Sequence, residues 1–177
     1  MEFNECIKTR RSIRKYIDKK IEQDTIKKII EATLFAPSWK HTQVARYYIV
    51  LDPIKKKAIT DSMPDFNILQ CESAPCLIVS TMFKNRSGYN RDGTFSTNKE
   101  KGWQMYDCGI SNYLFTLEAH NQGLGTVIMG IYDEEVINKT LDIPKSEEIA
   151  VVIALGYYDE DGQLPKQRNV EDIYCIK

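Results

Sequence analysis

The chain has 177 residues, which is enough for one domain with a substantial core and short for two. Its 24 Lys and Arg residues balance 25 Asp and Glu residues, so the formal charge is only −1. Such a balance excludes the strong basic field that draws proteins to nucleic acids or membrane surfaces. We therefore expect a single domain over residues 1–177, with no nucleic acid and no membrane as partner.

Residues 1–5 contain neither a basic segment nor an apolar run, and no stretch is apolar and long enough to span a bilayer. We expect a cytoplasmic protein. The cysteines are widely spaced and form no C-x-x-C pair, and the chain has only two histidines. This predicts scattered reduced thiols and no metal site. The cysteines are Cys6, Cys71, Cys76, Cys108 and Cys175.

A basic cluster, residues 10–16, comes first along the chain. It places Arg10, Arg11, Ser12 and Arg14 beside a predicted helix end. Each guanidinium offers a rigid fork of donors that matches a pair of anionic oxygens, and serine adds a short hydrogen bond, so the cluster is suited to a phosphate. A solvated helix end is the alternative interpretation, and this segment alone does not decide between them.

The next element is an amphipathic helix, predicted over residues 24–36. Its apolar side chains recur at steps of three and four residues, Asp24 is placed as the N-cap, and Pro37 ends the helix. Three strands are expected at residues 46–51, 76–83 and 149–157. They are short, nearly continuously apolar and rich in β-branched and aromatic residues, which is typical of strands buried on both faces.

A second helix is predicted over residues 103–121. Its apolar side chains cover more than one stripe, so we expect it to lie at the centre of a core or of a dimer interface. Residues 84–101 precede it; they are polar, contain glycines and lack periodicity, which indicates a loop near a site or a lid.

Glycines follow this helix at Gly123 and Gly125, and Gly130 comes shortly after. The spacing is wrong for a dinucleotide-binding fingerprint, and a helix precedes the segment where that motif requires a strand, so a Rossmann fold is excluded. We expect Gly123 to cap the C-terminus of the helix. Gly130 is suited to a position where a ligand must approach the backbone closely.

Four segments in this order resemble the nitroreductase family of FMN-dependent oxidoreductases. They are the basic cluster, the loop at residues 37–43, the glycine segment 123–126, and a basic pair at residues 166–168. The resemblance runs over residues 5–173, and the joint occurrence is far more specific than any one segment. It implies an α+β fold, with a mixed but mainly antiparallel sheet flanked by helices, and an interlocked homodimer with FMN at the subunit interface.

The resemblance also implies which residues bind FMN. Arg10, Arg11 and Ser12 would hold the phosphate and the ribityl chain, and Arg14 would lie near N1 and O2 of the ring. A cation there favours the anionic reduced flavin. Lys166 and Arg168 match a C-terminal pair that closes over the same phosphate; a solvated tail is the alternative for a lone K-x-R.

The loop at residues 37–41 matches a family loop that contacts the flavin bound mainly by the other subunit. Its expected contacts are Pro37, Ser38, Trp39 and His41. His41 stands where the family usually has Asn. A neutral imidazole can replace one hydrogen bond, but it titrates near neutrality; a surface histidine is the alternative.

Three more positions complete the expected flavin site. Asn67 matches a residue that hydrogen-bonds the pyrimidine edge, although Asn in a loop is also a common turn residue. Met129 and Gly130 match a segment whose backbone N–H groups approach flavin N5. With FMN in place, no side chain need act as acid or base, so we expect no catalytic residue.

The implied activity is ping-pong transfer from NAD(P)H, through FMN, to a nitroaromatic, a quinone or a similar small acceptor. The acceptor and the choice between NADH and NADPH are left open, although Trp39, Tyr89, Phe95 and Trp103 could stack on a planar substrate. A flavin-binding carrier or sensor without turnover is one alternative. A nucleotide- or phosphosugar-binding module that uses the same arginines is another.

Overall fold

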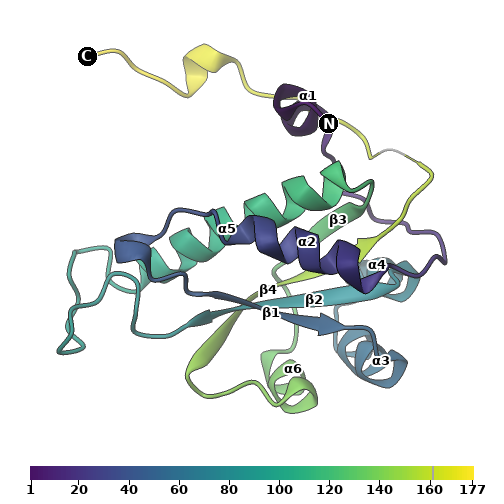
Figure 1. Ribbon diagram of the computed structural model, residues 1–177, viewed down its shortest axis with the longest axis horizontal. Helices are drawn as coiled ribbons and strands as arrows, with labels where there is room; N and C mark the ends of the chain where they lie inside the picture. The colour runs from purple at the N-terminus through teal and green to yellow at the C-terminus, as the bar shows by residue number, and fades with distance from the viewer. Residues whose placement is uncertain (161) are drawn as a thin grey trace.

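The computed structural model describes residues 1–160 and 162–177. A four-stranded sheet in the order β1-β2-β4-β3 forms its middle layer. In Figure 1, α2 and α5 cover one face of this sheet, and α3 and α6 lie on the other. The strands are β1 (Ala45–Val50), β2 (Cys76–Phe83), β3 (Gly125–Met129) and β4 (Glu147–Gly156). The helices are α1 (Phe3–Thr9), α2 (Gln23–Thr33), α3 (Pro53–Asp61), α4 (Asp65–Ser73), α5 (Gly102–Asn121) and α6 (Glu134–Leu141).

The expected α+β architecture is confirmed, with antiparallel pairing between all neighbouring strands. A single parallel bridge joins Ser12 to Thr126 at the β3 edge, within the described residues. Central strand β2 is almost wholly buried, as expected. The same expectation is wrong for β1, which is partly exposed because it is an edge strand with a neighbour on one side only.

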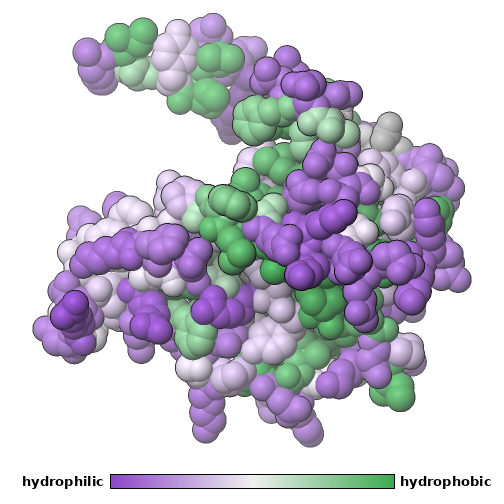
Figure 2. All heavy atoms as spheres, viewed as in Figure 1, coloured by the Kyte–Doolittle hydropathy of each residue, from purple (hydrophilic) through white to green (hydrophobic). Residues whose placement is uncertain are grey.

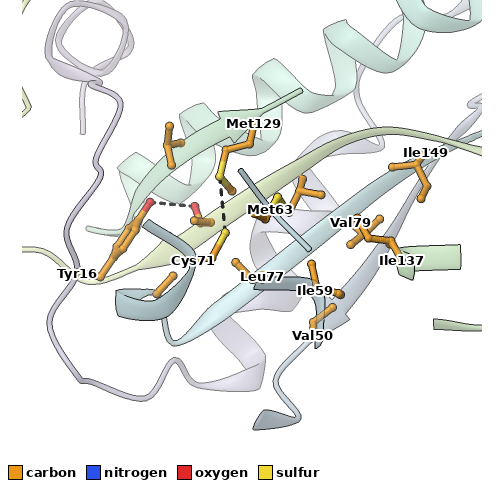
Figure 3. Packing of buried hydrophobic residues seen from close by; sticks show 14 of the residues in the cluster. Tyr16, Val50, Ile59, Met63, Cys71, Leu77, Val79, Met129, Ile137 and Ile149 are labelled. Atoms are coloured by element: carbon orange, nitrogen blue, oxygen red, sulfur yellow. Dashed lines mark hydrogen bonds between the residues drawn. The ribbon is translucent and has the colours of Figure 1, made fainter. Parts of the chain in front are cut away.

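The side chains of β2 alternate between two cores, as the period of two in a strand requires. Leu77 and Val79 face the core shown in Figure 3, together with Ile59 of α3. Ile78 faces the opposite core, which includes Phe115 of α5. All of these side chains are fully buried. The sheet is therefore clamped by apolar packing on both faces.

Helix α2 departs from its predicted boundaries. It begins at Gln23 and ends at Thr33, and Glu22 is the N-cap residue, with no capping hydrogen bond from its side chain. Asp24 is thus inside the first turn, where a carboxylate favours the helix dipole without capping it. Residues 34–36 continue as a turn, in which the Ala36 N–H donates to the Thr33 carbonyl at 3.1 Å.

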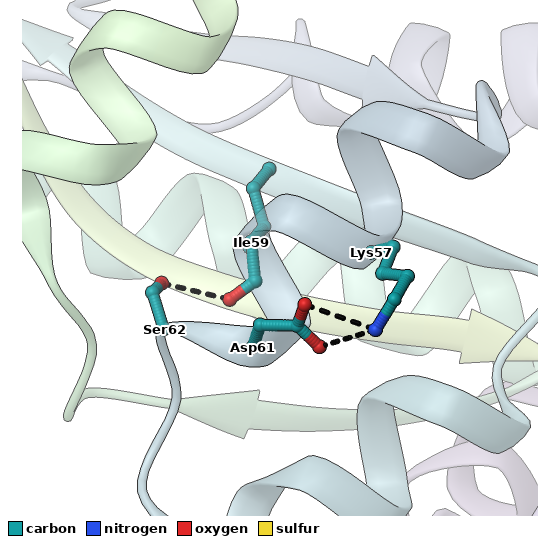
Figure 4. Close-up of polar contacts among 4 residues, drawn as sticks. All are labelled: Lys57, Ile59, Asp61 and Ser62. Carbon is teal, nitrogen blue, oxygen red and sulfur yellow. Dashed lines mark hydrogen bonds and ion pairs between the residues drawn. The ribbon is translucent and has the colours of Figure 1, made fainter.

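Helix α3 shows why a short segment holds its shape at the surface. The Asp52 carboxylate accepts hydrogen bonds from the N–H groups of Ile54 and Lys55, both at 2.9 Å, and Pro53 occupies the first turn. Figure 4 shows the Lys57–Asp61 ion pair one turn apart, at 2.8 Å. This helix keeps Ile59 against the sheet.

Helix α5 ends in a Schellman motif, which confirms the predicted cap at Gly123. Gly123 has φ 76°, its N–H donates to the His120 carbonyl at 2.9 Å, and the Leu124 N–H donates to the Ala119 carbonyl at 2.8 Å. The chain turns back here directly into β3.

Part of the broad apolar surface predicted for α5 is exposed in this chain. Met105, Tyr106 and Tyr113 are 45%, 61% and 46% exposed, whereas the polar Gln104 and Asp107 are buried. Large apolar side chains on a water-facing helix surface are typical of an interface with another chain.

Residues 163–177 leave the body of the molecule and run across the top of Figure 1 to the C-terminus. Figure 2 shows hydrophobic side chains along this arm. They are Val170, Ile173, Tyr174 and Ile176, between 55% and 87% exposed. None of the helices in the described part of the chain is both long and apolar enough to cross a membrane.

Candidate functional site

The basic cluster borders a cavity of about 580 Å³ between the end of α1 and the C-terminal segment. Arg10 is the C-cap residue of α1, which confirms the predicted helix end. Arg10, Arg11, Ser12 and Arg14 all line the cavity. The opposite wall consists of Gln163, Leu164, Pro165 and Gln167.

Within the described residues, the three guanidiniums at this cavity form no ion pair with a carboxylate. One Arg11 terminal nitrogen donates to the carbonyls of Lys8 and Arg10, at 2.7 and 2.8 Å. Arg14 donates to the Ser12 carbonyl at 3.3 Å. Within the described residues, no ion pair involves any of the three arginines. Their charges are therefore available to an anion in the cavity.

Strand β3 fixes the backbone of the cluster. The Ile13 N–H donates to the Thr126 carbonyl at 2.9 Å. A Cβ at Gly125 would lie 2.5 Å from Ile13 Cγ1, so glycine is required there by packing inside the chain. A Cβ at Gly162 would lie 2.7 Å from the Ser12 carbonyl oxygen. The chain returning from β4 therefore passes directly over the cluster.

Asn67 lies near the end of the same strand. It is on helix α4 rather than in a loop, is 6% exposed, and donates from Nδ2 to the Ile131 carbonyl at 3.3 Å. The Met129 side chain is buried, and its sulfur accepts a 3.8 Å contact from the Cys71 thiol (Figure 3). Any contact between Met129 and a ligand would therefore have to come from its backbone, and that contact stays a prediction.

The position of Gly130 differs from that of Gly125. No atom of the described chain lies within 4 Å of the place where a Cβ would be. Packing inside the chain does not require glycine at this position, and the space in front of it is open. That space lies beside Asn67, and the resemblance places flavin N5 there.

The basic pair Lys166 and Arg168 is exposed and does not line the basic cavity; its neighbours Pro165 and Gln167 do. The structure thus brings the C-terminal segment to the cavity without bringing these two side chains into it. Their phosphate contact stays a prediction.

The loop at residues 37–43 is held elsewhere, against the N-terminal half of α5. The Trp39 N–H donates to the buried Asp107 carboxylate at 2.9 Å, and the same oxygen accepts from the Ser87 hydroxyl. The Trp39 and Trp103 rings lie 4.8 Å apart. Lys40, His41 and Gln43 have φ of 45°, 57° and 45°, a conformation that costs energy for residues with side chains. These contacts therefore hold the backbone of the 37–43 loop in an unfavourable conformation.

Within this loop, Pro37 and His41 are exposed, and Ser38 accepts a hydrogen bond from the Gln43 N–H at 3.0 Å. The exposed ring of His41 is free to meet another molecule, and whether it meets flavin stays a prediction.

The predicted site residues thus form two groups at opposite ends of α5 (Figure 1). The basic cluster lies near its C-terminal end, where Ser12 pairs with Thr126 at the start of β3, and the 37–43 loop lies near its N-terminal end, where Trp39 bonds to Asp107. α5 has 20 residues and is about 30 Å long at 1.5 Å per residue. One chain cannot bring both groups to one small ligand.

Sequence reasoning did not single out Asp107. Its carboxylate is 2% exposed and ties the loop to α5. The available signal was a charged residue at a position that the helical period turns inward, between Gln104 and Ser111. Burial usually excludes an unpaired carboxylate, so such a residue indicates a specific set of donors.

The buried thiols near the basic cavity are unreactive. Burial raises the pKa of Cys71 to about 11 and that of Cys76 to about 12. Both therefore stay protonated at neutral pH and cannot act as nucleophiles. The described residues also contain no group of His, Cys, Asp and Glu that could hold a metal.

Comparisons with known proteins show which family this chain belongs to. The Nitroreductase family model matches residues 7–157. A curated relative from Thermus thermophilus, named NADH dehydrogenase, is 29% identical, and the match covers 91% of each chain. A nitroreductase family protein from Clostridium novyi NT has a TM-score of 0.78 and 27% identity over 90% of this chain and 87% of its own. A structure in complex with FMN from Exiguobacterium sibiricum has a TM-score of 0.88 at 20% identity, covering 100% and 98%. This chain belongs to the nitroreductase family.

Proposed function

We propose that the protein is an FMN-dependent NAD(P)H oxidoreductase, formed by one domain over residues 1–177 and active as a homodimer. The observation that carries this proposal is the cavity of about 580 Å³ bordered by three guanidiniums that form no ion pair within the described part of the chain. The name of the Thermus thermophilus relative and the FMN complex among the structural neighbours support the same assignment.

The residues present fit FMN. Arg10, Arg11 and Ser12 would hold the phosphate, because they line a cavity at which the described residues place no carboxylate. Arg14 would lie toward the ring. The open space before Gly130 would admit the flavin edge to the backbone, and Asn67 lies beside it.

Bound FMN supplies two-electron chemistry, by taking a hydride from NAD(P)H and passing the electrons to an acceptor. For a nitroaromatic the balance is ArNO₂ + NAD(P)H + H⁺ → ArNO + NAD(P)⁺ + H₂O. For a quinone it is Q + NAD(P)H + H⁺ → QH₂ + NAD(P)⁺. We propose ping-pong kinetics, in which NAD(P)⁺ leaves before the acceptor binds. The task of the side chains is to bind and orient, and none acts as a catalytic acid or base.

The homodimer follows from the separation of the two groups. A second copy of the chain can bring its 37–43 loop to the basic cluster of the first, which the loop of the same chain cannot reach. The exposed apolar side chains of α5 and of the C-terminal arm supply the surface for such an interface.

The test is an absorption spectrum of the purified protein, before and after NADH or NADPH is added without oxygen. We expect flavin bands that bleach with the donor and return with a quinone. Flavin bands that persist with both donors would indicate a carrier or sensor. A colourless protein that does not bind added FMN would contradict the proposal and favour a nucleotide- or phosphosugar-binding module.

A further inference from the structure

A second cavity, of about 550 Å³, lies beside the 37–43 loop and shares no lining residue with the basic cavity. We call it the loop cavity. Its volume is in the range of small-molecule sites in proteins. One wall comes from the 37–43 loop and the other from the beginning of the 84–101 loop. Its walls include Trp39, Lys40, Thr42, Arg86, Tyr89 and Arg91.

Asp107 fixes both walls of the loop cavity at once. One carboxylate oxygen accepts from the Trp39 N–H on the first wall and from the Ser87 hydroxyl on the second. The second wall also bonds to α5 through the Arg86 N–H, which donates to Gln104 at 3.3 Å. The cavity is therefore part of the folded framework and not a chance gap between two surface loops.

The charge at this cavity is positive. Lys40, Arg86 and Arg91 line it, and no carboxylate does. In the described part of the chain none of these cations forms an ion pair. The nearby Asp107 does not line the cavity, and its carboxylate already accepts hydrogen bonds from Trp39 and Ser87. The exposed Asp92 carboxylate accepts from the Thr94 N–H and hydroxyl, at 3.0 and 2.6 Å.

Two polar atoms on the first wall are buried without a partner. They are the indole nitrogen of Trp39 and the hydroxyl of Thr42, each without a hydrogen bond within the described residues. A buried donor without a partner costs free energy, so such groups in native proteins usually meet a ligand or an ordered water. The indole and phenol rings of Trp39 and Tyr89 also offer flat apolar surface.

We propose that the loop cavity binds the electron acceptor and selects planar acceptors that carry an anionic group, of the class of aromatic carboxylates such as nitrobenzoates. The cations would bind the carboxylate, and the aromatic rings would contact the planar body. This inference rests on the proposed function, because the 37–41 loop is the segment expected at the flavin of the partner subunit. The reaction is the one balanced above, and only its substrate class is added.

Binding can be measured without turnover, because Trp39 lines this cavity and the other of the two tryptophans, Trp103, lies against the Trp39 ring. We would titrate the FMN-loaded protein with benzoate and with benzamide, a neutral molecule of similar shape, and follow tryptophan fluorescence. We expect benzoate to bind about tenfold more tightly, with the preference falling as salt is raised. Equal affinities would overturn the proposal.

The variants are Arg86→Gln and Arg91→Gln, alone and combined; both side chains are exposed, so the fold should tolerate them. We expect the double variant to lose most of the benzoate preference, and to lower kcat/KM for 4-nitrobenzoate about tenfold while 4-nitrobenzamide changes little. Lys101→Gln is the matched control, since Lys101 is the exposed N-cap residue of α5 and does not line the cavity.

Phosphates of the nicotinamide donor are a second source of anionic charge, and the kinetics distinguish them. If the double variant raises KM for NADPH or NADH but leaves the ratio of the two acceptors unchanged, the cations serve the donor and our proposal is wrong. Failure of the wild-type protein to bind FMN would instead contradict the proposed function. The two failures are therefore distinguishable.

Discussion

At Gly130, the effect of a substitution on ligand binding can be separated from its effect on folding. Its Cβ position is open within the chain, so Gly130→Ala should leave the thermal midpoint nearly unchanged. If flavin approaches this backbone, the added methyl group should weaken FMN binding about tenfold or more. Equilibrium titration with FMN and a thermal melt of the flavin-free protein measure the two effects.

Gly125→Ala is the control for this variant. Its Cβ would lie 2.5 Å from Ile13 Cγ1 and 2.8 Å from a ring carbon of Tyr158, so we expect it to lower the thermal midpoint. Normal FMN affinity in Gly130→Ala would remove this glycine from the flavin site.

Arg14 is predicted to lie near the flavin ring, where its positive charge should affect how easily the flavin is reduced. Arg14→Ala should lower FMN affinity about tenfold and make the bound flavin harder to reduce, because a nearby cation stabilises the anionic reduced form. A redox titration against a dye of known potential tests the second effect. Lys55→Ala is the control, since Lys55 is exposed on α3 and does not line the basic cavity. An unchanged potential in Arg14→Ala would contradict the assigned position.

Cys76 links stability to alkaline pH. Burial raises its pKa from 9.0 to about 12, so folding favours the protonated thiol. This contribution to stability is complete below pH 9 and is lost as pH rises toward about 12. From about pH 8 to 10.5, the free energy of unfolding measured with urea should therefore fall by about 1–2 kcal/mol less in Cys76→Ala than in the wild type. The control Cys175→Ala, at an exposed thiol, should show the same pH dependence of unfolding free energy as the wild type. The same dependence in Cys76→Ala would contradict the raised pKa.

At the scale of elements, α5 presents an outward apolar face that the proposed dimer would cover. Gly109 lies on this face near Tyr106 and Tyr113, and no atom of the chain lies within 4 Å of a Cβ placed there. In a monomer, Gly109→Gln would favour the helix by roughly 0.5–1 kcal/mol. In a dimer that uses this face, the same side chain obstructs contact. We expect dimer dissociation to become at least about tenfold easier in sedimentation equilibrium.

The matched control for Gly109→Gln is Lys28→Gln, which places the same side chain on the exposed face of α2. It should leave the dimer intact. If Gly109→Gln raises the melting temperature and the protein sediments as the wild type does, the exposed face of α5 is not the interface.

The elements that the sequence predicted are those whose partners lie in the same chain. Strand β2 matches its predicted limits because its whole length is apolar and buried. Strand β3 was not predicted, since five residues with two neighbouring glycines give too short a pattern. The broad apolar surface of α5 was recognised, but the sequence left open whether a core or a second chain covers it, because periodicity shows that a face is apolar without showing what covers it.

The same limit applies to the site. The arginines of the basic cluster were identifiable because their chemistry is local, and the structure places them together on one cavity. The loop cavity could not be read from the sequence, because the segments that carry Trp39 and Arg86 are joined through Asp107, whose carboxylate accepts from Trp39 and Ser87. Such a contact between distant segments leaves no local pattern.

At the scale of the whole molecule, a site made from two chains predicts complementation between two defective ones. Arg10→Ala combined with Arg14→Ala damages the basic cluster, and Trp39→Ala combined with His41→Ala damages the loop. Each homodimer then carries two defective sites. In a mixed dimer, one site receives both defects and the other receives none.

Co-expression with two different affinity tags allows the mixed dimer to be purified away from both homodimers. We expect it to bind about one FMN per dimer, half of the wild-type content, while each homodimer binds little. If each chain built its own site, every site in the mixed dimer would still carry one damaged half and flavin would stay low. Because the two defects lie at opposite ends of α5, recovery in the mixed dimer would require the cluster of one chain and the loop of the other to meet at one flavin.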